Sequence, residues 1–208
     1  MLIATFNING TNARLPRLLE WLAATQPDVA CLQEIKTQDF PAGVLREAGY
    51  RTLFVGQKGF NGVAILSRQP AVEVLRGLPG DAGDEQARYL EADCAGVRIA
   101  SLYLPNGNPV PGPKFDYKLA WMQRLQARAA VLLASGLPVV LAGDYNVIPH
   151  DDDVWDPRAM AADALMQPAA RAAYRQLLWQ GWTDAVRQRH PAGGVWTFWD
   201  YQAGAWSR

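Results

Sequence analysis

A short apolar run that ends in a carboxylate and an amide constrains the fold of this chain more than any other feature. Residues 139–142 are Val, Val, Leu and Ala, bounded by a proline and a glycine. That pattern is typical of a short strand buried on both faces. Asp144 and Asn146 follow two positions apart, and such side chains point to the same side of extended backbone. Because open sheets place sites beyond strand ends, we predict a site here, the alternative being two simple turn formers.

The first two expected strands, residues 2–9 and 29–33, also end in oxygen-bearing side chains, Asn7 and Glu34. Between them, leucines at i, i+3, i+4 and i+7 spacing predict an amphipathic helix at residues 14–25. A strand-helix-strand unit usually has parallel strands. The pattern therefore predicts that Asn7 and Glu34 lie at the same edge of one sheet.

Later segments alternate between hairpins and helical connections. Two strands on either side of an Asn61-Gly62 turn signal are predicted to form an antiparallel hairpin. We predict strands at residues 50–55, 62–67, 71–75, 89–94, 97–104 and 195–201, and helices at 116–135 and 169–180. This mixture favours a layered α/β domain with mixed sheets over a doubly wound parallel sheet. With no linker or repeat, residues 1–208 are predicted to form a single domain.

Composition excludes several classes of protein. Half of the residues are apolar and 19% are charged, which is typical of a globular chain. The formal net charge is zero, which neither supports nor excludes a nucleic-acid partner. Cys31 lies in an apolar run and is predicted to be a buried free thiol, and two cysteines suggest a reducing compartment. With neither a signal peptide nor a membrane span, we expect a cytoplasmic protein without a membrane partner.

Polar side chains at four expected strand ends share one pattern: Asn7, Glu34, Tyr103, and Asp144 with Asn146. Converging carboxylates and amides suit a hard cation such as Mg²⁺. The chain has only two histidines and two cysteines, too few for a zinc cluster. The three aspartates at 151–153 are interpreted as a solvated loop or a helix start rather than a second metal site.

Six short motifs occur in order along the whole chain. They are Phe6-Asn7-Ile8-Asn9-Gly10, Leu32-Gln33-Glu34-Ile35-Lys36, Gly56-Gln57-Lys58-Gly59 with Asn61-Gly62-Val63-Ala64-Ile65-Leu66-Ser67, Tyr103-Leu104-Pro105-Asn106-Gly107, Gly143-Asp144-Tyr145-Asn146, and Thr197-Phe198-Trp199-Asp200-Tyr201. Together they resemble exonuclease III, the bacterial AP endonuclease branch of the endonuclease/exonuclease/phosphatase superfamily. The resemblance implies a DNase I-like, four-layered α/β sandwich in which helices flank two mixed, mostly antiparallel sheets.

The resemblance also implies an activity. It implies a monomeric, Mg²⁺-dependent DNA repair nuclease, with Mn²⁺ as an alternative metal. Its substrate would be double-stranded DNA, cleaved 5′ to abasic sites and from 3′ ends. Phosphodiester hydrolysis needs an in-line nucleophile and positive charge or hydrogen-bond donors on the phosphate oxygens. The residue types in the six motifs can supply these groups.

The resemblance implies a role for each polar residue at the strand ends. Glu34 would ligate the metal, with Asn7 close by. Tyr103 would hydrogen-bond the scissile phosphate. Asp144, beside the metal, would orient or deprotonate the attacking water or protonate the leaving oxygen. Asn146, also a candidate metal contact together with Asn7 and Asp144, would stabilise the charged transition state.

Substrate binding is implied for four further residues. Lys58 and Asn106 would contact the DNA, and Phe198 and Trp199 would line a pocket for a base-free sugar. The alternative for these two aromatic residues is a place in the core. Four basic residues are candidates for a phosphate-binding rim or, alternatively, are solvated surface charges: Lys58, Arg88, Lys114 and Lys118.

The chain departs from the family pattern after Tyr201. The family pattern continues through an Arg-Ile-Asp strand to a terminal Ser-Asp-His motif, whereas this chain stops at Arg208. His150 and His190 lie in the wrong contexts to replace that motif. We therefore expect a C-terminally truncated domain that lacks its last strands and is nearly inactive by itself. The alternatives are a catalytically impaired DNA-binding module and a phosphatase of the same fold that acts on lipids or inositol phosphates.

Overall fold

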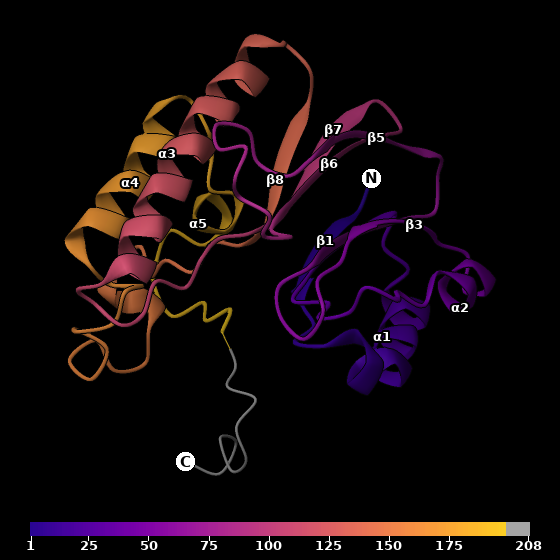
Figure 1. Cartoon of the computed structure of the whole chain (residues 1–208), viewed down its shortest axis with the longest axis horizontal. Helices are drawn as coiled ribbons and strands as arrows, with labels where there is room; N and C mark the ends of the chain where they lie inside the picture. The colour runs from indigo at the N-terminus through magenta and orange to yellow at the C-terminus, as the bar shows by residue number, and fades with distance from the viewer. Residues whose placement is uncertain (199–208) are drawn as a thin grey trace.

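Two stacked β-sheets lie between two layers of helices in the computed structural model, which describes residues 1–198 (Figure 1). The strands are β1 (Ile3–Asn7), β2 (Val29–Gln33), β3 (Arg51–Val55), β4 (Val63–Ser67), β5 (Ala71–Arg76), β6 (Tyr89–Cys94), β7 (Val97–Tyr103) and β8 (Val139–Asp144). The helices are α1 (Thr11–Thr25), α2 (Ala42–Glu47), α3 (Pro113–Ala134), α4 (Pro168–Trp179), α5 (Ala185–Arg189) and the short 3-10 helix η1 (Asp151–Asp153).

Within residues 1–198, each sheet has four strands and contains one parallel pair. The first sheet has the order β1-β2-β4-β3, and the second has the order β5-β6-β7-β8. The pairs β1–β2 and β7–β8 are parallel, each connected through a helix, and the other neighbours are antiparallel. The predicted strand-helix-strand unit, the hairpin of β3 and β4, and the layered α/β class with two mixed sheets are therefore confirmed.

The alternation of side chains along β2 explains how the layers are held together. All five residues of β2 are buried. Ala30 and Leu32 pack in one core with Leu18 and Leu22 of α1. Cys31, on the opposite face, packs in a second core against residues of the other sheet. A strand with apolar side chains on both faces fits the centre of a sandwich, as its sequence predicts.

The second sheet is covered by α3 and α4 on its outer face (Figure 1). The ring of Trp121 in α3 meets that of Tyr89 in β6 edge-on, with 6.4 Å between the centroids. A charged contact joins the same elements, because Arg128 of α3 donates to both oxygens of the fully buried Glu91 at 2.7 and 2.6 Å. Apolar packing and this paired charge together fix α3 on the sheet.

Two differences from the sequence-based expectation concern local structure. The strand predicted at 195–201 is wrong for 195–198, which form no ladder, and its last three residues lie outside the described part. Helices α2 and α5 were not predicted, because both are too short to show a periodic apolar pattern. The run of three aspartates does start a helix, η1. None of the helices within residues 1–198 combines the length and apolar character needed to cross a membrane.

Candidate active site

The polar ends of four strands meet at one place between the two sheets. Asn7 ends β1, Glu34 follows β2, and Tyr103 and Asp144 are register partners at the ends of β7 and β8. The side-chain nitrogen of Asn7 donates to Glu34 Oε1 at 2.9 Å and to Asp144 Oδ2 at 2.8 Å. One amide thus connects carboxylates from the two sheets, and the predicted meeting of Asn7 and Glu34 at one edge of the first sheet is confirmed.

Donors surround the Glu34 carboxylate on both oxygens. The Tyr103 hydroxyl donates to Oε1 at 2.9 Å, and the Lys36 ammonium lies 2.6 Å from Oε2. Burial alone raises the pKa of Glu34, but the hydrogen bonds from Lys36, Asn7 and Tyr103 outweigh it, so the pKa is lowered overall. Glu34 is therefore an anion at neutral pH.

Asp144 and Tyr103 are shifted in the opposite direction. Burial raises the pKa of Asp144, and the negative charge of Glu34 adds to the effect. Hydrogen bonds from Asn7 and from the Asn146 backbone oppose this rise. Burial and the charge of Glu34 also raise the pKa of Tyr103, so its hydroxyl stays protonated and can donate a hydrogen bond at neutral pH.

Arg88 supports the Tyr103 ring. Its guanidinium carbon lies 4.7 Å from the ring centroid, and its Nη1 donates to the Tyr103 carbonyl oxygen at 3.2 Å. A cation over an aromatic face is attracted by the ring quadrupole. Arg88 therefore fixes the ring whose hydroxyl points at Glu34 and brings a positive charge next to the site.

The loop after β8 turns back over the loop after β7. The Asn146 backbone nitrogen donates to Asp144 Oδ1 at 2.9 Å, and its side chain donates to the Leu104 carbonyl at 2.9 Å. Asn106 Nδ2 lies 3.4 Å from Asn146 Oδ1. A Cβ on Gly143 would collide with the Leu102 carbonyl oxygen, so only glycine permits this close approach of the two strands.

Four residues around the site have left-handed backbone conformations. These are Asn9 (φ 48°), Glu34 (φ 53°), Lys36 (φ 53°) and Asn146 (φ 45°). Asparagine adopts this conformation readily, but glutamate and lysine pay roughly 1 kcal/mol or more. The ion pair of Lys36 with Glu34 and the hydrogen bond from Lys36 to Asn9 hold this segment. Strain of this kind gathers at functional sites.

The donor atoms of the site suit a hard divalent cation. Through Asn7, the Glu34 and Asp144 oxygens lie within about 6 Å of each other. In residues 1–198, no group of three or more His, Cys, Asp or Glu side chains is arranged to hold a metal. Two carboxylates with amide oxygens nearby fit an ion that keeps several waters, as Mg²⁺ does, and not a zinc cluster.

The substrate-binding residues predicted from the sequence are only partly brought together. Asn106 lies beside Asn146, whereas Lys58 is exposed on the β3–β4 loop. Phe198 is 77% exposed, so no aromatic pocket forms around it in the described part of the chain, and Trp199 lies outside that part. The prediction that these residues contact substrate remains a prediction.

The predicted phosphate-binding rim requires one correction. Arg88 lies at the site and Lys114 is exposed, but Lys118 is completely buried, so it belongs neither to a rim nor to the solvated surface. Its spacing from Trp121, Met122 and Leu125 puts it in the apolar stripe of α3, a signal available from the sequence. Lys36 lies within a recognised motif, but sequence reasoning gave it no role.

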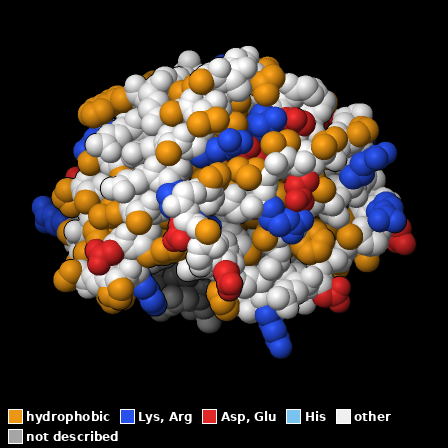
Figure 2. Space-filling model, turned by 45° about the horizontal axis from the view of Figure 1, so that its top comes forward, with side chains coloured by type: hydrophobic (Ala, Val, Ile, Leu, Met, Phe, Trp, Pro, Cys, Tyr) orange, Lys and Arg blue, Asp and Glu red, His pale blue; other side chains and the backbone are white. Residues whose placement is uncertain are grey.

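Surface charge on one face of the molecule gives no separate guide to the site. On the face shown in Figure 2, basic and acidic side chains are interspersed among hydrophobic ones. The three aspartates of η1 do not form a second cation site, because Asp151 pairs with Arg171 and Asp153 with Arg187.

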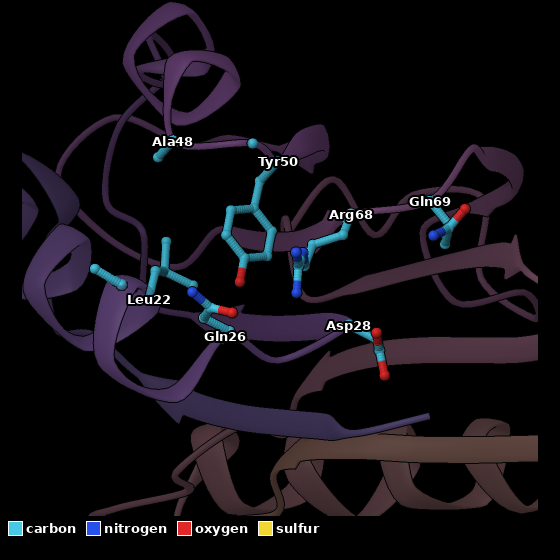
Figure 3. Close-up of a pocket in the computed structure, with 9 residues that line it drawn as sticks. Leu22, Gln26, Asp28, Ala48, Tyr50, Arg68 and Gln69 are labelled. Atoms are coloured by element: carbon cyan, nitrogen blue, oxygen red, sulfur yellow. The ribbon is translucent and has the colours of Figure 1, made fainter.

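A cavity of about 590 Å³ lies at the other end of the first sheet. It includes Tyr50, Arg68 and Asp28, whose side chains are seen in Figure 3. Asp28 precedes β2 and Arg68 follows β4, whereas Glu34 follows β2, so a full strand length separates the cavity from the carboxylates. The cavity is therefore not part of the candidate active site.

Comparison with known proteins gives consistent matches over the whole chain. Residues 4–208 match the model of the Endonuclease/Exonuclease/phosphatase family. Exodeoxyribonuclease III of Haemophilus influenzae is 31% identical over 220 residues, which cover 98% of this chain and 81% of that protein. Among solved structures, an AP endonuclease from Archaeoglobus fulgidus superposes with a TM-score of 0.93 at 36% identity. A 3′ phosphatase from Neisseria, bound to a product DNA hairpin, gives a TM-score of 0.94 at 36% identity. Each of the two superpositions covers 100% of this chain and 82% of the chain in the solved structure.

Proposed function

The chain belongs to the endonuclease/exonuclease/phosphatase family, in its branch of exonuclease III and AP endonucleases, and from this premise we propose a divalent-metal-dependent DNA repair nuclease. Its reaction would be hydrolysis of phosphodiesters in double-stranded DNA, 5′ to abasic sites and from 3′ ends. The observation that carries the proposal is the connection of Glu34 to Asp144 through Asn7, beside the Tyr103 hydroxyl.

Mg²⁺ is the metal we propose, with Mn²⁺ as the alternative. Glu34 would be the main carboxylate ligand of the ion. Asp144 and the side-chain amides of Asn7 and Asn146 would lie on the same side of the ion as Glu34. When bound there, the metal would supply positive charge to the phosphate oxygens and lower the pKa of a nearby water. Burial raises the pKa of Asp144. This supports the assignment, because a divalent cation would favour the ionised form of the Asp144 carboxyl group.

The chain's own residues would carry the remaining chemistry. The protonated Tyr103 hydroxyl would donate to a phosphate oxygen. Ionised Asp144 would orient the attacking water and accept its proton, since it lies at the same strand end. The Asn146 amide, fixed by Leu104 and Asn106, would stabilise the charge that develops on the phosphoryl group.

A second candidate activity is removal of a phosphate from a DNA 3′ end. The similarity to a 3′ phosphatase bound to product DNA favours it. A phosphate monoester at a 3′ end needs the same positive charge and the same donors as a phosphodiester. Similarity to DNA-acting proteins over the whole chain favours DNA over lipid or inositol phosphates.

The decisive experiment uses one duplex with a central abasic site and one with a 3′-phosphate, each with Mg²⁺ and then with EDTA. Wild type, Glu34→Ala, Asp144→Ala and the exposed control Glu20→Ala are compared. We expect slow but Mg²⁺-dependent incision by wild type and Glu20→Ala, and at least about 10²-fold slower incision by the two site variants. Binding without cleavage in every form would favour the DNA-binding module and overturn the nuclease proposal.

Action as a single-domain monomer in the cytoplasm completes the proposal. Sedimentation of the purified chain and fractionation of cells that produce it would test these two points.

A further inference from the structure

Lys118 is a completely buried lysine in the apolar stripe of α3. Its exposed fraction is 0%, and its ammonium donates to three backbone carbonyl oxygens. The acceptors are Pro105 at 3.0 Å, Asn106 at 3.1 Å and Asn146 at 2.5 Å. An ammonium has three donors and no acceptor, so these three bonds satisfy it fully. Burying such a charge is costly, and its retention points to a specific task.

The three acceptors belong to the two loops that carry the amides of the candidate active site. Pro105 and Asn106 lie in the loop after β7, directly beyond Tyr103. Asn146 lies in the loop after β8, directly beyond Asp144. The side-chain oxygen of Asn146 lies 3.4 Å from the side-chain nitrogen of Asn106, which joins the same two loops. Lys118 therefore connects the two loops through one amino group.

We propose that Lys118 is a positioning residue for the nuclease reaction: it sets the Asn106 and Asn146 amides relative to Tyr103 and Asp144. This inference rests on the proposed function and adds to it a residue that touches no substrate. The bonds end on backbone atoms, so they fix the path of both loops and not the chemistry of any side chain. A loop displaced by 1 Å would move the amides out of reach of a phosphate oxygen.

A second observation shows that the loop is built around this lysine. A Cβ at Gly107 would lie 2.7 Å from Lys118 Cδ, and Gly107 has a φ of +96°. Both the backbone conformation and the space favour glycine there. The methylene stem of Lys118 thus packs against the loop after β7. Its ammonium donates to carbonyl oxygens of this loop and of the loop after β8.

The test compares Lys118→Met, Lys118→Arg and the control Gln123→Met, an exposed polar side chain in the same helix. Methionine keeps the length of the stem and removes the donors. We expect Lys118→Met to lower kcat by about 10- to 100-fold and to change KM for abasic duplex by less than about threefold. Lys118→Arg is expected to recover most of the lost kcat, and the control to match wild type.

Two outcomes would overturn the inference. One is a wild-type kcat for folded Lys118→Met. The other is an equal loss in Lys118→Met and Lys118→Arg, which would indicate a packing role instead. If Lys118→Met does not fold, Gly107→Ala takes its place, because the added Cβ displaces the lysine stem. A kcat of Gly107→Ala within about twofold of wild type would then overturn the inference.

A readout without turnover separates this inference from the proposed function. The side-chain amide resonances of Asn106 and Asn146 can be assigned in ¹H–¹⁵N spectra from Asn→Asp variants. We expect Lys118→Met to shift both resonances and to leave that of Asn12, an exposed residue of α1, unchanged. Unchanged Asn106 and Asn146 resonances would refute the positioning role, whereas absence of cleavage by wild type would refute only the nuclease.

Discussion

The side-chain amide of Asn7 lies 2.8 Å from the carboxylate of Asp144, a residue 137 positions away along the chain. The two residues end strands of different sheets, so this contact reports directly on how the sheets are stacked. The same amide also donates to Glu34 at 2.9 Å. Its nitrogen therefore holds the two carboxylates close together.

The first prediction concerns this donor. Asn7→Ala leaves the Glu34 and Asp144 carboxylates without their shared partner, which weakens their orientation towards a metal. We expect nuclease activity to fall by about 10- to 100-fold with a near-wild-type melting temperature, as for loss of an outer-shell partner. Gln188→Ala, which removes an exposed amide from α5, is the control and should match wild type. Unchanged incision rates over a Mg²⁺ titration of Asn7→Ala would contradict the prediction.

The convergence of strand ends could be predicted from the sequence because it follows from two local patterns. A buried apolar strand followed by an oxygen-bearing residue occurs at Glu34 and again at Asp144. Parallel pairing through a helix brings such ends to one edge of a sheet. The stacking of the two sheets follows from β2. Its side chains are apolar on both faces, so one layer must bury each face, and these layers are α1 and the second sheet.

Other features could not be predicted, because the residue types involved do not normally adopt the backbone conformation or the location that the structure gives them. Glutamate does not favour left-handed backbone, so the conformation of Glu34 depends on tertiary contacts. Lysine is normally a surface residue, so Lys118 was expected outside even though it occupies a position of the apolar stripe. The segment 195–198 has β-branched and aromatic residues, but a strand also needs a partner for its backbone groups, and propensity does not supply one.

The second prediction separates a site tyrosine from a structural one. Tyr103→Phe removes the hydroxyl that donates to Glu34 at 2.9 Å, and we expect kcat to fall by about 10²-fold. Tyr145→Phe removes a hydroxyl that donates to the Leu141 carbonyl at 2.9 Å. That variant should lose about 1 kcal/mol of stability and keep its kcat. Single-turnover cleavage and urea unfolding of both variants test the contrast, which fails if the two tyrosines affect kcat equally.

The third prediction concerns the buried charge between α3 and the second sheet. Arg128→Met leaves the fully buried Glu91 with a hydrogen bond from the Tyr89 hydroxyl and with the cation of Arg98, whose Nη1 lies 3.7 Å away. We expect the free energy of unfolding to fall by about 3 kcal/mol, because an underpaired buried carboxylate is costly. The double variant Glu91→Gln/Arg128→Met should be more stable than Arg128→Met alone. Arg17→Met breaks an exposed pair with Glu20 and should change stability by less than about 1 kcal/mol in urea unfolding.

The fourth prediction concerns alkaline pH. Burial, with a smaller contribution from Cys94, raises the pKa of Cys31 from 9.0 to about 12. Between these values the unfolded chain loses the thiol proton while the folded chain keeps it, so the folded state binds more protons. Stability from Cys31 is therefore complete below pH 9 and is lost as the pH rises towards 12, by at most about 1.4 kcal/mol per pH unit.

Because tyrosines titrate in the same range, the measurement is a difference between wild type and Cys31→Ala. Urea unfolding at pH 8, 9 and 10 should give a steeper loss of stability for wild type than for the variant. The native thiol should also react with an alkylating reagent only as fast as the protein opens, because a buried neutral thiol is a poor nucleophile. Parallel stability profiles for the two proteins, or alkylation of Cys31 in the folded state at the rate of a free peptide, would show that the thiol is not held neutral by its place between the sheets.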